Sequence, residues 1–204
     1  MRLVCLDLEG VLVPEIWIAF SEAAGIPELR RTTRDEPDYD KLMRFRLELL
    51  ERHGLKLPDI QRVIGGMEPL PGAAAFAEKI RERTQLVILS DTFEEFAKPL
   101  MQKLRWPTLF CNSLVATADG TITGYTLRQK NGKREAVRAF ASLNMEVFAA
   151  GDSFNDLAMI REAKAGCLFR APEGIRRDHP DIPCVDTYDA LLERIGAFLA
   201  ENRT

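Results

Sequence analysis

The chain has 204 residues, of which 46% are hydrophobic and 29% charged, and its formal net charge is -3. This composition is typical of a globular protein with a proper core, and the length allows one α/β domain with an inserted subdomain. The slightly negative net charge does not indicate a nucleic-acid-binding protein, and no apolar run is long enough to cross a membrane.

Cysteine and histidine usage also narrows the class of protein. The four cysteines form no CxxC pair, and at least Cys5 and Cys167 lie in strand-like runs, so we expect buried free thiols instead of disulfides or zinc ligands. His53 and His179 do not indicate a histidine metal site. Because acids occur by position 7 and no signal peptide is recognisable, we expect a cytoplasmic protein. The sequence gives no indication of the oligomeric state.

The first predicted strand, an apolar run from Arg2 to Leu6, leads directly into two carboxylates. Because side chains alternate along a strand, Asp7 and Glu9 are expected to project the same way, and Gly10 allows a sharp turn after them. Ligands of open α/β sheets bind beyond the carboxyl ends of the strands. Two acids there repel each other unless a cation lies between them, and Mg²⁺ prefers such oxygen ligands. An ordinary acidic turn is the alternative.

Residues 14–68 are predicted to be helical with no strand among them. The assigned segments are a helix from Pro14 to Gly25, a polar loop over 27–37, a helix from about Asp38 to His53, and a short helix from Pro58 to Ile64. This pattern predicts an inserted helical cap over 14–68, carried by a core formed from residues 1–13 and 69–204.

After Pro71 the predicted strands alternate with helices. The strands are 86–90, 146–150, 165–169 and 183–186, and the helices are 72–83, 93–104, 132–142, 172–178 and 188–201, with one more after Ser153. Within 107–126, the pair Asp119-Gly120 between strand-like runs predicts a β-hairpin. The alternation favours a doubly wound, Rossmann-like parallel sheet with helices on both faces and right-handed crossovers.

Polar residues follow two further strands of this sheet. Ser90 either caps the next helix or forms a phosphate cradle with the free N–H groups of that helix start. Asp152 follows the strand at 146–150, and Asp156 falls on the same side one helical turn later. Together with Asp7 and Glu9 they would place four carboxylates at one edge, which is costly without a cation. Lys133 is either the matching positive charge or an ordinary surface lysine.

These groups, Asp7-x-Glu9-Gly-Val-Leu, Ser90, Lys133 and Gly151-Asp152-x-x-x-Asp156, resemble the four ordered motifs of the haloacid dehalogenase (HAD) superfamily. The resemblance implies that Asp7 is a nucleophile that becomes a phospho-aspartate. It implies that Mg²⁺ is held by Asp7, the backbone carbonyl of Glu9, Asp152 and Asp156. Metal, Lys133 and Ser90 would then offset the charge of the phosphoryl oxygens. Glu9, where most superfamily phosphatases have aspartate, would act as the general acid and base.

Arg46 lies inside an apolar helix face. On a wheel of about 100° per residue it falls within the arc of Leu42, Leu49 and Leu50. A guanidinium in a packing face needs an anionic partner, or its charged end must reach solvent at the edge of that face. We therefore consider three roles for Arg46: a structural ion pair, a side chain that snorkels to solvent, and a clamp for a substrate carboxylate. Glu15 either favours the helix dipole or binds a substrate ammonium.

Glu15 and Arg46 together would recognise both charges of an amino acid, an arrangement that resembles the helical-capped phosphoserine phosphatases. The segments 6–17, 86–92 and 150–156 are similar to the bacterial ThrH-type phosphoserine phosphatase/homoserine phosphotransferase family. This likeness implies phosphoserine as the phosphoryl donor and water or homoserine as the acceptor. Together with the HAD resemblance it implies that Ser90, Asp91 and Lys133 surround the phosphoryl group, and that Asn155 contacts either that group or the neighbourhood of Ser90.

Two alternatives to this function follow from the same residues. The first is a HAD phosphatase for another small phosphate ester. The second is a receiver-type phospho-acceptor signalling domain, which also carries acids and a lysine at strand ends. Receivers are shorter and place the phospho-acceptor on the third strand, whereas residues 40–60 of this chain are predicted to be helical.

Overall fold

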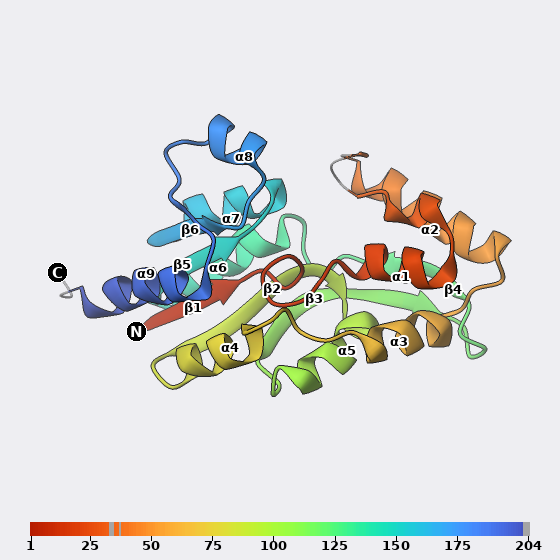
Figure 1. Ribbon diagram of the computed structural model, residues 1–204, viewed down its shortest axis with the longest axis horizontal. Helices are drawn as coiled ribbons and strands as arrows, with labels where there is room; N and C mark the ends of the chain where they lie inside the picture. Colours follow the sequence, from red (N-terminus) through yellow and green to blue (C-terminus); the bar gives the residue numbers. More distant parts are fainter. Residues whose placement is uncertain (33–34, 37, 202–204) are drawn as a thin grey trace.

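A seven-stranded sheet lies at the centre of the computed structural model, which describes residues 1–32, 35–36 and 38–201. The strands are β1 (Arg2–Leu6), β2 (Gln85–Phe93), β3 (Thr108–Ala116), β4 (Ile122–Thr126), β5 (Glu146–Gly151), β6 (Ala165–Phe169) and β7 (Cys184–Val185). Their order is β4-β3-β2-β1-β5-β6-β7, and neighbours are parallel except β3 and β4. The predicted doubly wound α/β fold is confirmed, with β1 in the middle of the sheet (Figure 1).

Helices cover both faces of this sheet because its central strand is apolar on both sides. Val4 and Leu6 belong to the larger hydrophobic cluster, whereas Leu3 and Cys5 belong to the smaller one on the other face. Around the larger cluster pack α4 (Ala73–Arg81), α5 (Glu94–Lys103) and α9 (Tyr188–Ala200). Around the smaller cluster pack α6 (Gly132–Ser142), α7 (Leu157–Glu162) and α8 (Glu173–Asp178).

Among the described residues of 14–68 the regular elements are all helices, as predicted. They are α1 (Ile16–Ala24), a 3₁₀ turn (Pro27–Arg30), α2 (Tyr39–Arg52) and α3 (Leu57–Gly66). The start of the predicted loop at 27–37 is therefore helical, because proline suits the first turn of a helix. Positions 33–34 and 37 of that prediction lie outside the described residues. The predicted helix start at Asp38 is confirmed, since its side chain accepts the N–H of Lys41.

The helices over 14–68 share one hydrophobic cluster with the sheet. Met43 and Ile60 from this segment belong to the same cluster as Leu6, and the ring of Trp17 meets that of Phe96 in α5 edge-on at 5.6 Å. Figure 1 shows α1 and α3 lying along the extension of β3 and β4, beside α5. That these helices act as a cap stays a prediction.

In the β2 to β4 region one prediction is confirmed and one strand is longer than predicted. The predicted hairpin is confirmed: β3 and β4 are antiparallel, and the turn closes with Gly120 at a φ of 85°. By contrast, β2 continues to Phe93 although its predicted end was Ser90, and α5 begins only at Glu94. The cause is Phe93, which is buried and pairs with Asn112 of β3 after a register irregularity.

No helix in the described part of the chain is both long and apolar enough to span a membrane. Cys5 and Cys167 are buried free thiols, as predicted. Burial raises the pKa of both thiols, that of Cys167 to about 12.

Candidate active site

Three buried carboxylates meet at the carboxyl ends of β1 and β5. Asp7 directly follows β1, Asp152 directly follows β5, and the Asp7 N–H donates to Ala150 in β5. Asp156 reaches the same place from a 3₁₀ turn (Phe154–Asp156). One oxygen from each of the three carboxylates lies within 4.8 Å of the others. Burial, with Asp156 and Asp152 close by, raises the pKa of Asp7 well above its usual range, against the opposing pull of Lys133.

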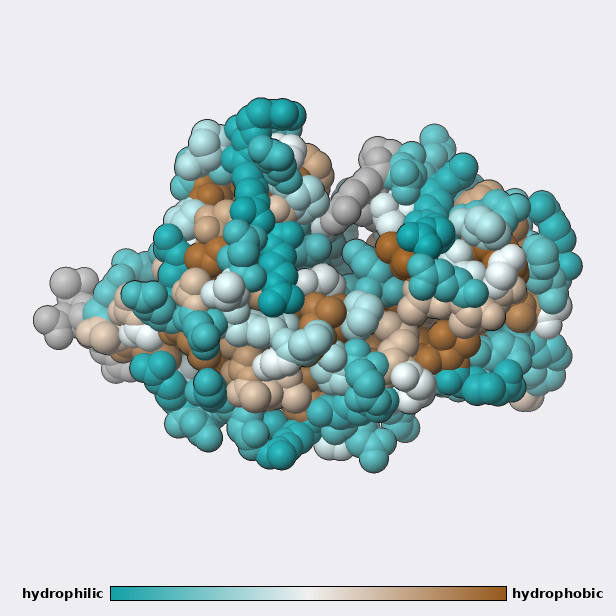
Figure 2. All heavy atoms as spheres, in the orientation of Figure 1, coloured by the Kyte–Doolittle hydropathy of each residue, from teal (hydrophilic) through white to brown (hydrophobic). Residues whose placement is uncertain are grey.

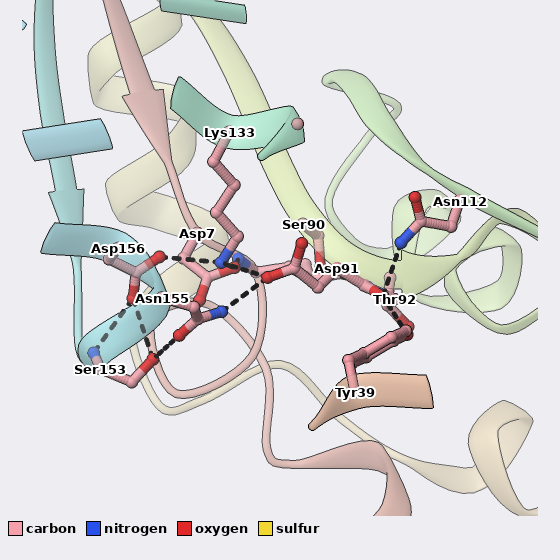
Figure 3. Close-up of polar contacts among 12 residues, drawn as sticks. Asp7, Tyr39, Ser90, Asp91, Thr92, Asn112, Lys133, Ser153, Asn155 and Asp156 are labelled. Atoms are coloured by element: carbon pink, nitrogen blue, oxygen red, sulfur yellow. Dashed lines mark hydrogen bonds and ion pairs between the residues drawn. The ribbon is translucent and has the colours of Figure 1, made fainter. Parts of the chain in front are cut away.

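Lys133, in the first turn of α6, points into this cluster (Figure 3). Its Nζ lies 2.9 Å from Asp7 Oδ1, 2.8 Å from Asp156 Oδ1 and 3.5 Å from Asp91 Oδ2. The side chain is only 5% exposed, so its burial disfavours the charge, but the three acids raise its pKa well above the usual value. Lys133 is therefore a buried cation fixed by carboxylates, and the alternative of an ordinary surface lysine is wrong.

The acid cluster fits a divalent cation. Three acids face one lysine within it, and clustered carboxylate oxygens are the donor set that Mg²⁺ takes in proteins. Two glycines leave room for it. A Cβ at Gly10, whose φ is 75°, would overlap the Asp152 carboxylate, and one at Gly151 would overlap Asp156. Asp7, Asp152 and Asp156 are therefore the side chains in the described part of the chain that would hold the metal.

Ser90 lies beside the cluster but not at a helix start. Its Oγ accepts the N–H of Thr92 at 3.2 Å, and α5 begins four residues after Ser90. The prediction of a phosphate cradle built from Ser90 and the next helix start is wrong, because β2 continues to Phe93. Ser90 still lines the same cavity as Asp7.

A polar layer surrounds Asp91, next to Ser90. The Asp91 carboxylate accepts from Asn155 Nδ2 at 2.7 Å, so the predicted place of Asn155 near Ser90 agrees with the structure. The backbone carbonyl of Asp91 accepts from Tyr39 Oη at 3.2 Å and from Asn112 Nδ2 at 3.0 Å. Neither Tyr39 nor Asn112 was predicted from the sequence as a site residue. A signal existed only for Tyr39, which lies two helical turns before Arg46 on the same helix face.

The Glu9 carboxylate does not join the other acids. It accepts the N–H of Ile16, at the start of α1, at 2.8 Å. The prediction of four carboxylates at one edge is wrong for Glu9, because β1 ends at Leu6 and the alternation of a strand does not extend to position 9. Burial and then the neighbouring Glu15 raise the pKa of Glu9 to about 7. The acid thus faces α1 and keeps a proton more readily than an exposed glutamate.

Arg46 is buried in α2, as its place on an apolar face predicts. One terminal nitrogen donates to the carbonyl of Arg31 at 2.8 Å, and the guanidinium lies 4.4 Å from the ring centre of Trp17. Its buried Nε has no hydrogen-bond partner in the described structure. Burial lowers the pKa of Arg46 to about 10. Glu15 immediately precedes α1, although it was predicted to lie just inside the helix.

One cavity joins these groups. It has a volume of about 100 Å³ and is lined by Asp7, Glu9, Glu15, Arg46, Ser90, Asp91, Lys133, Asp152 and Asn155, among others. A second cavity of about 540 Å³ adjoins it beyond Asp91 and Asn155. Figure 2 shows the surface hollowed between the part that carries α7 and α8 and the part that carries α2. Asp7 and Asp152 of the acid cluster therefore face the same small volume as Glu15 and Arg46. Asp156 is fully buried behind them.

This fold and this cluster are those of a family of hydrolases. The family model of haloacid dehalogenase-like hydrolases matches residues 1–164, so the chain belongs to that family. The resemblance inferred from the four motifs is confirmed, and the receiver-type signalling domain is excluded.

Named relatives are similar over nearly the whole chain. A phosphoserine phosphatase ThrH of Pseudomonas aeruginosa is 57% identical over 94% of this chain and 93% of its own length. A phosphoserine phosphatase of Pseudomonas syringae pv. tomato is 56% identical over 100% of this chain and 85% of its own length. The predicted resemblance to the ThrH type is thereby confirmed.

Solved structures agree on the fold. A crystal structure of a phosphoserine phosphatase in its apo form covers 94% of this chain and 97% of its own, with a TM-score of 0.77 and 22% identity.

Proposed function

We propose that this chain is a magnesium-dependent phosphoserine phosphatase that also passes the phosphoryl group to homoserine. The observation that carries the proposal is the single cavity with two chemically different ends. The buried acids and Lys133 suit a phosphoryl group and a divalent cation, whereas Arg46 and Glu15 suit the carboxylate and ammonium of an amino acid. The names of the two Pseudomonas relatives support the same substrate.

The first half of the proposed reaction is an attack by Asp7 on phosphorus. An Asp7 carboxylate oxygen forms the new bond to phosphorus while the bond from phosphorus to the serine oxygen breaks. Glu9, with its pKa raised to about 7, donates the proton that this leaving oxygen needs. Lys133 balances negative charge on the phosphoryl oxygens and on Asp7, and Ser90 offers its hydroxyl to the same oxygens.

The second half returns Asp7 to its starting state. Water or an alcohol attacks phosphorus, the bond from phosphorus to Asp7 breaks, and Glu9 takes the proton of the attacking oxygen. Magnesium would be held by Asp7, Asp152 and Asp156, and by the Glu9 carbonyl as the family resemblance implies, and it would further neutralise the phosphoryl charge. Homoserine has the ammonium and carboxylate that Glu15 and Arg46 would hold. Once homoserine is bound, its hydroxyl would be oriented toward the phospho-aspartate, whereas a free water molecule would have no such fixed orientation.

The assignment of substrate and nucleophile is tested by phosphate release. Wild type should release phosphate from phosphoserine only with magnesium and much faster than from other small phosphate esters. The variant Asp7→Asn should keep the fold and lose at least about a thousandfold in kcat. Asp7→Asn that retains a few per cent of activity refutes the nucleophile, and faster turnover of another ester favours the alternative of a different HAD phosphatase.

Homoserine transfer needs its own measurement. Phosphoserine and homoserine together should give phosphohomoserine by ³¹P NMR, while free phosphate falls as homoserine rises. If phosphohomoserine stays at background at every homoserine concentration, the chain is a phosphatase alone.

The free buried thiols support a reducing compartment, so we place the enzyme in the cytoplasm.

A further inference from the structure

The backbone carbonyl of Asp91 is a junction of three distant parts of the chain. It accepts from the hydroxyl of Tyr39, the first residue of α2, and from the side-chain amide of Asn112 in β3. Figure 3 shows Tyr39 and Asn112 approaching this carbonyl, next to Ser90. Two donors on one carbonyl fix its position more firmly than a single bond would.

Tyr39 connects this junction to the amino-acid end of the cavity. Arg46 lies seven residues further along α2, which is about two helical turns, so both side chains share one face of the helix. Both line the active-site cavity. Burial raises the pKa of Tyr39, so that its hydroxyl keeps the proton that it donates.

Asn112 connects the same junction to the segment that carries Lys133. Its Nδ2 donates to Asp91, and its Oδ1 accepts the backbone N–H of Arg128 at 3.1 Å, shortly before α6 begins. The Asp91 carboxylate in turn lies 3.5 Å from Lys133 Nζ and accepts from Asn155. The phosphoryl end of the cavity is thus bonded, through one residue, to the helix that carries Arg46.

We propose that Tyr39 is a positioning residue, which fixes Arg46 relative to Ser90 so that both ends of one substrate are engaged at once. The inference rests on the proposed phosphoserine activity. Small errors in the placement of a substrate lower the rate of the chemical step more than they lower binding. A phosphate ester with no amino-acid end has nothing to align with Arg46 and does not need the Tyr39 hydroxyl.

The test is Tyr39→Phe, which removes the hydroxyl and keeps the ring. For phosphoserine, kcat should fall about fivefold, the rate equivalent of one ordinary hydrogen bond, with a smaller change in KM. For p-nitrophenyl phosphate, kcat should not change. In the background of Arg46→Met, Tyr39→Phe should cause no further loss of kcat on phosphoserine, because the arginine that Tyr39 positions is already absent.

Tyr125→Phe is the matched control. The Tyr125 hydroxyl donates to Asp40 in the first turn of α2, and its ring meets that of Tyr39 edge-on at 5.7 Å. Unlike Tyr39, Tyr125 is not among the described residues that line the active-site cavity. This variant should turn over both substrates like wild type. A selective loss in Tyr125→Phe equal to that of Tyr39→Phe would assign the effect to general anchoring of α2 and overturn the inference.

The two proposals fail in different ways. Equal losses on both substrates in Tyr39→Phe, or a full additional loss without Arg46, overturn the positioning role while wild-type phosphoserine turnover still supports the proposed function. Absence of phosphoserine turnover in wild type refutes the proposed function, and this inference with it.

Discussion

Replacement of Arg46 by methionine separates a substrate clamp from a structural arginine. Burial, partly offset by the nearby Tyr39, Glu9 and Glu15, lowers the pKa of this guanidinium to about 10, and a net shift of that size corresponds to roughly 3 kcal/mol. Methionine keeps an unbranched chain of similar length that adapts to the apolar surroundings.

The stabilising contacts of Arg46 are of similar size. Its cation–π contact with Trp17 contributes about 2 kcal/mol at a desolvated site, and its hydrogen bond to the Arg31 carbonyl about 1 kcal/mol. The terms cancel, so Arg46→Met should change the free energy of unfolding by less than about 1 kcal/mol. A structural buried ion pair would instead lose about 3–5 kcal/mol when one partner is removed.

Activity should respond very differently. Loss of a buried charge-assisted contact to a substrate carboxylate costs about 2–5 kcal/mol, so kcat/KM for phosphoserine should fall about 30-fold to several thousandfold. Turnover of p-nitrophenyl phosphate should remain within about twofold of wild type. The assays are urea denaturation followed by circular dichroism and phosphate release from both esters. A destabilisation above about 3 kcal/mol, or equal losses on the two esters, would refute the clamp.

Three further outcomes are expected. Gly10→Ala should abolish phosphate release because the added Cβ overlaps the Asp152 carboxylate. Gly25→Ala should lose stability but keep its activity, because Gly25 also has a positive φ but no atom lies within 4 Å of the added Cβ. Similar activities of the two variants would contradict this prediction. Added magnesium should raise the melting temperature of wild type by an amount equivalent to about 2.7 kcal/mol at a hundredfold excess over Kd, and Asp152→Asn should abolish most of that rise. An equal rise in wild type and variant would place the ion at another site. At pH 8 iodoacetamide should alkylate Cys111 and Cys167 far more slowly than an exposed thiol, because burial raises the pKa of both to about 12 and the reactive thiolate forms only as pH rises toward that value. Rapid labelling of either cysteine would contradict this prediction.

The acid cluster was predictable from the sequence because its position follows from strand topology. Asp7 and Asp152 each end an apolar run, and the carboxyl ends of neighbouring parallel strands meet at one edge of a sheet. The spacing of Asp156 follows from one turn of helical chain. Lys133 needed the family resemblance, since nothing in its own surroundings distinguishes it from a surface lysine.

The remaining features depend on packing between distant segments. Glu9 turns toward α1 because the chain leaves the strand conformation after Leu6, which a period-two pattern does not reveal. Tyr39 and Asn112 meet at one carbonyl only because α2 and β3 are both packed against the end of β2. The end of β2 itself is set by the pairing of Phe93 with Asn112, a contact between strands that local propensity does not encode.

The hydrophobic cluster common to the 14–68 helices and the sheet has a consequence for amide hydrogen exchange. Met43 of α2 and Ile60 of α3 are buried in the same cluster as Leu6, so in the described part of the chain these helices share their apolar core with the sheet. Their slowest-exchanging amides should therefore exchange with the same free energy and the same denaturant dependence as those of β1. Displacements of intact helices that open the cavity would leave those amides protected, so they should not appear in this exchange.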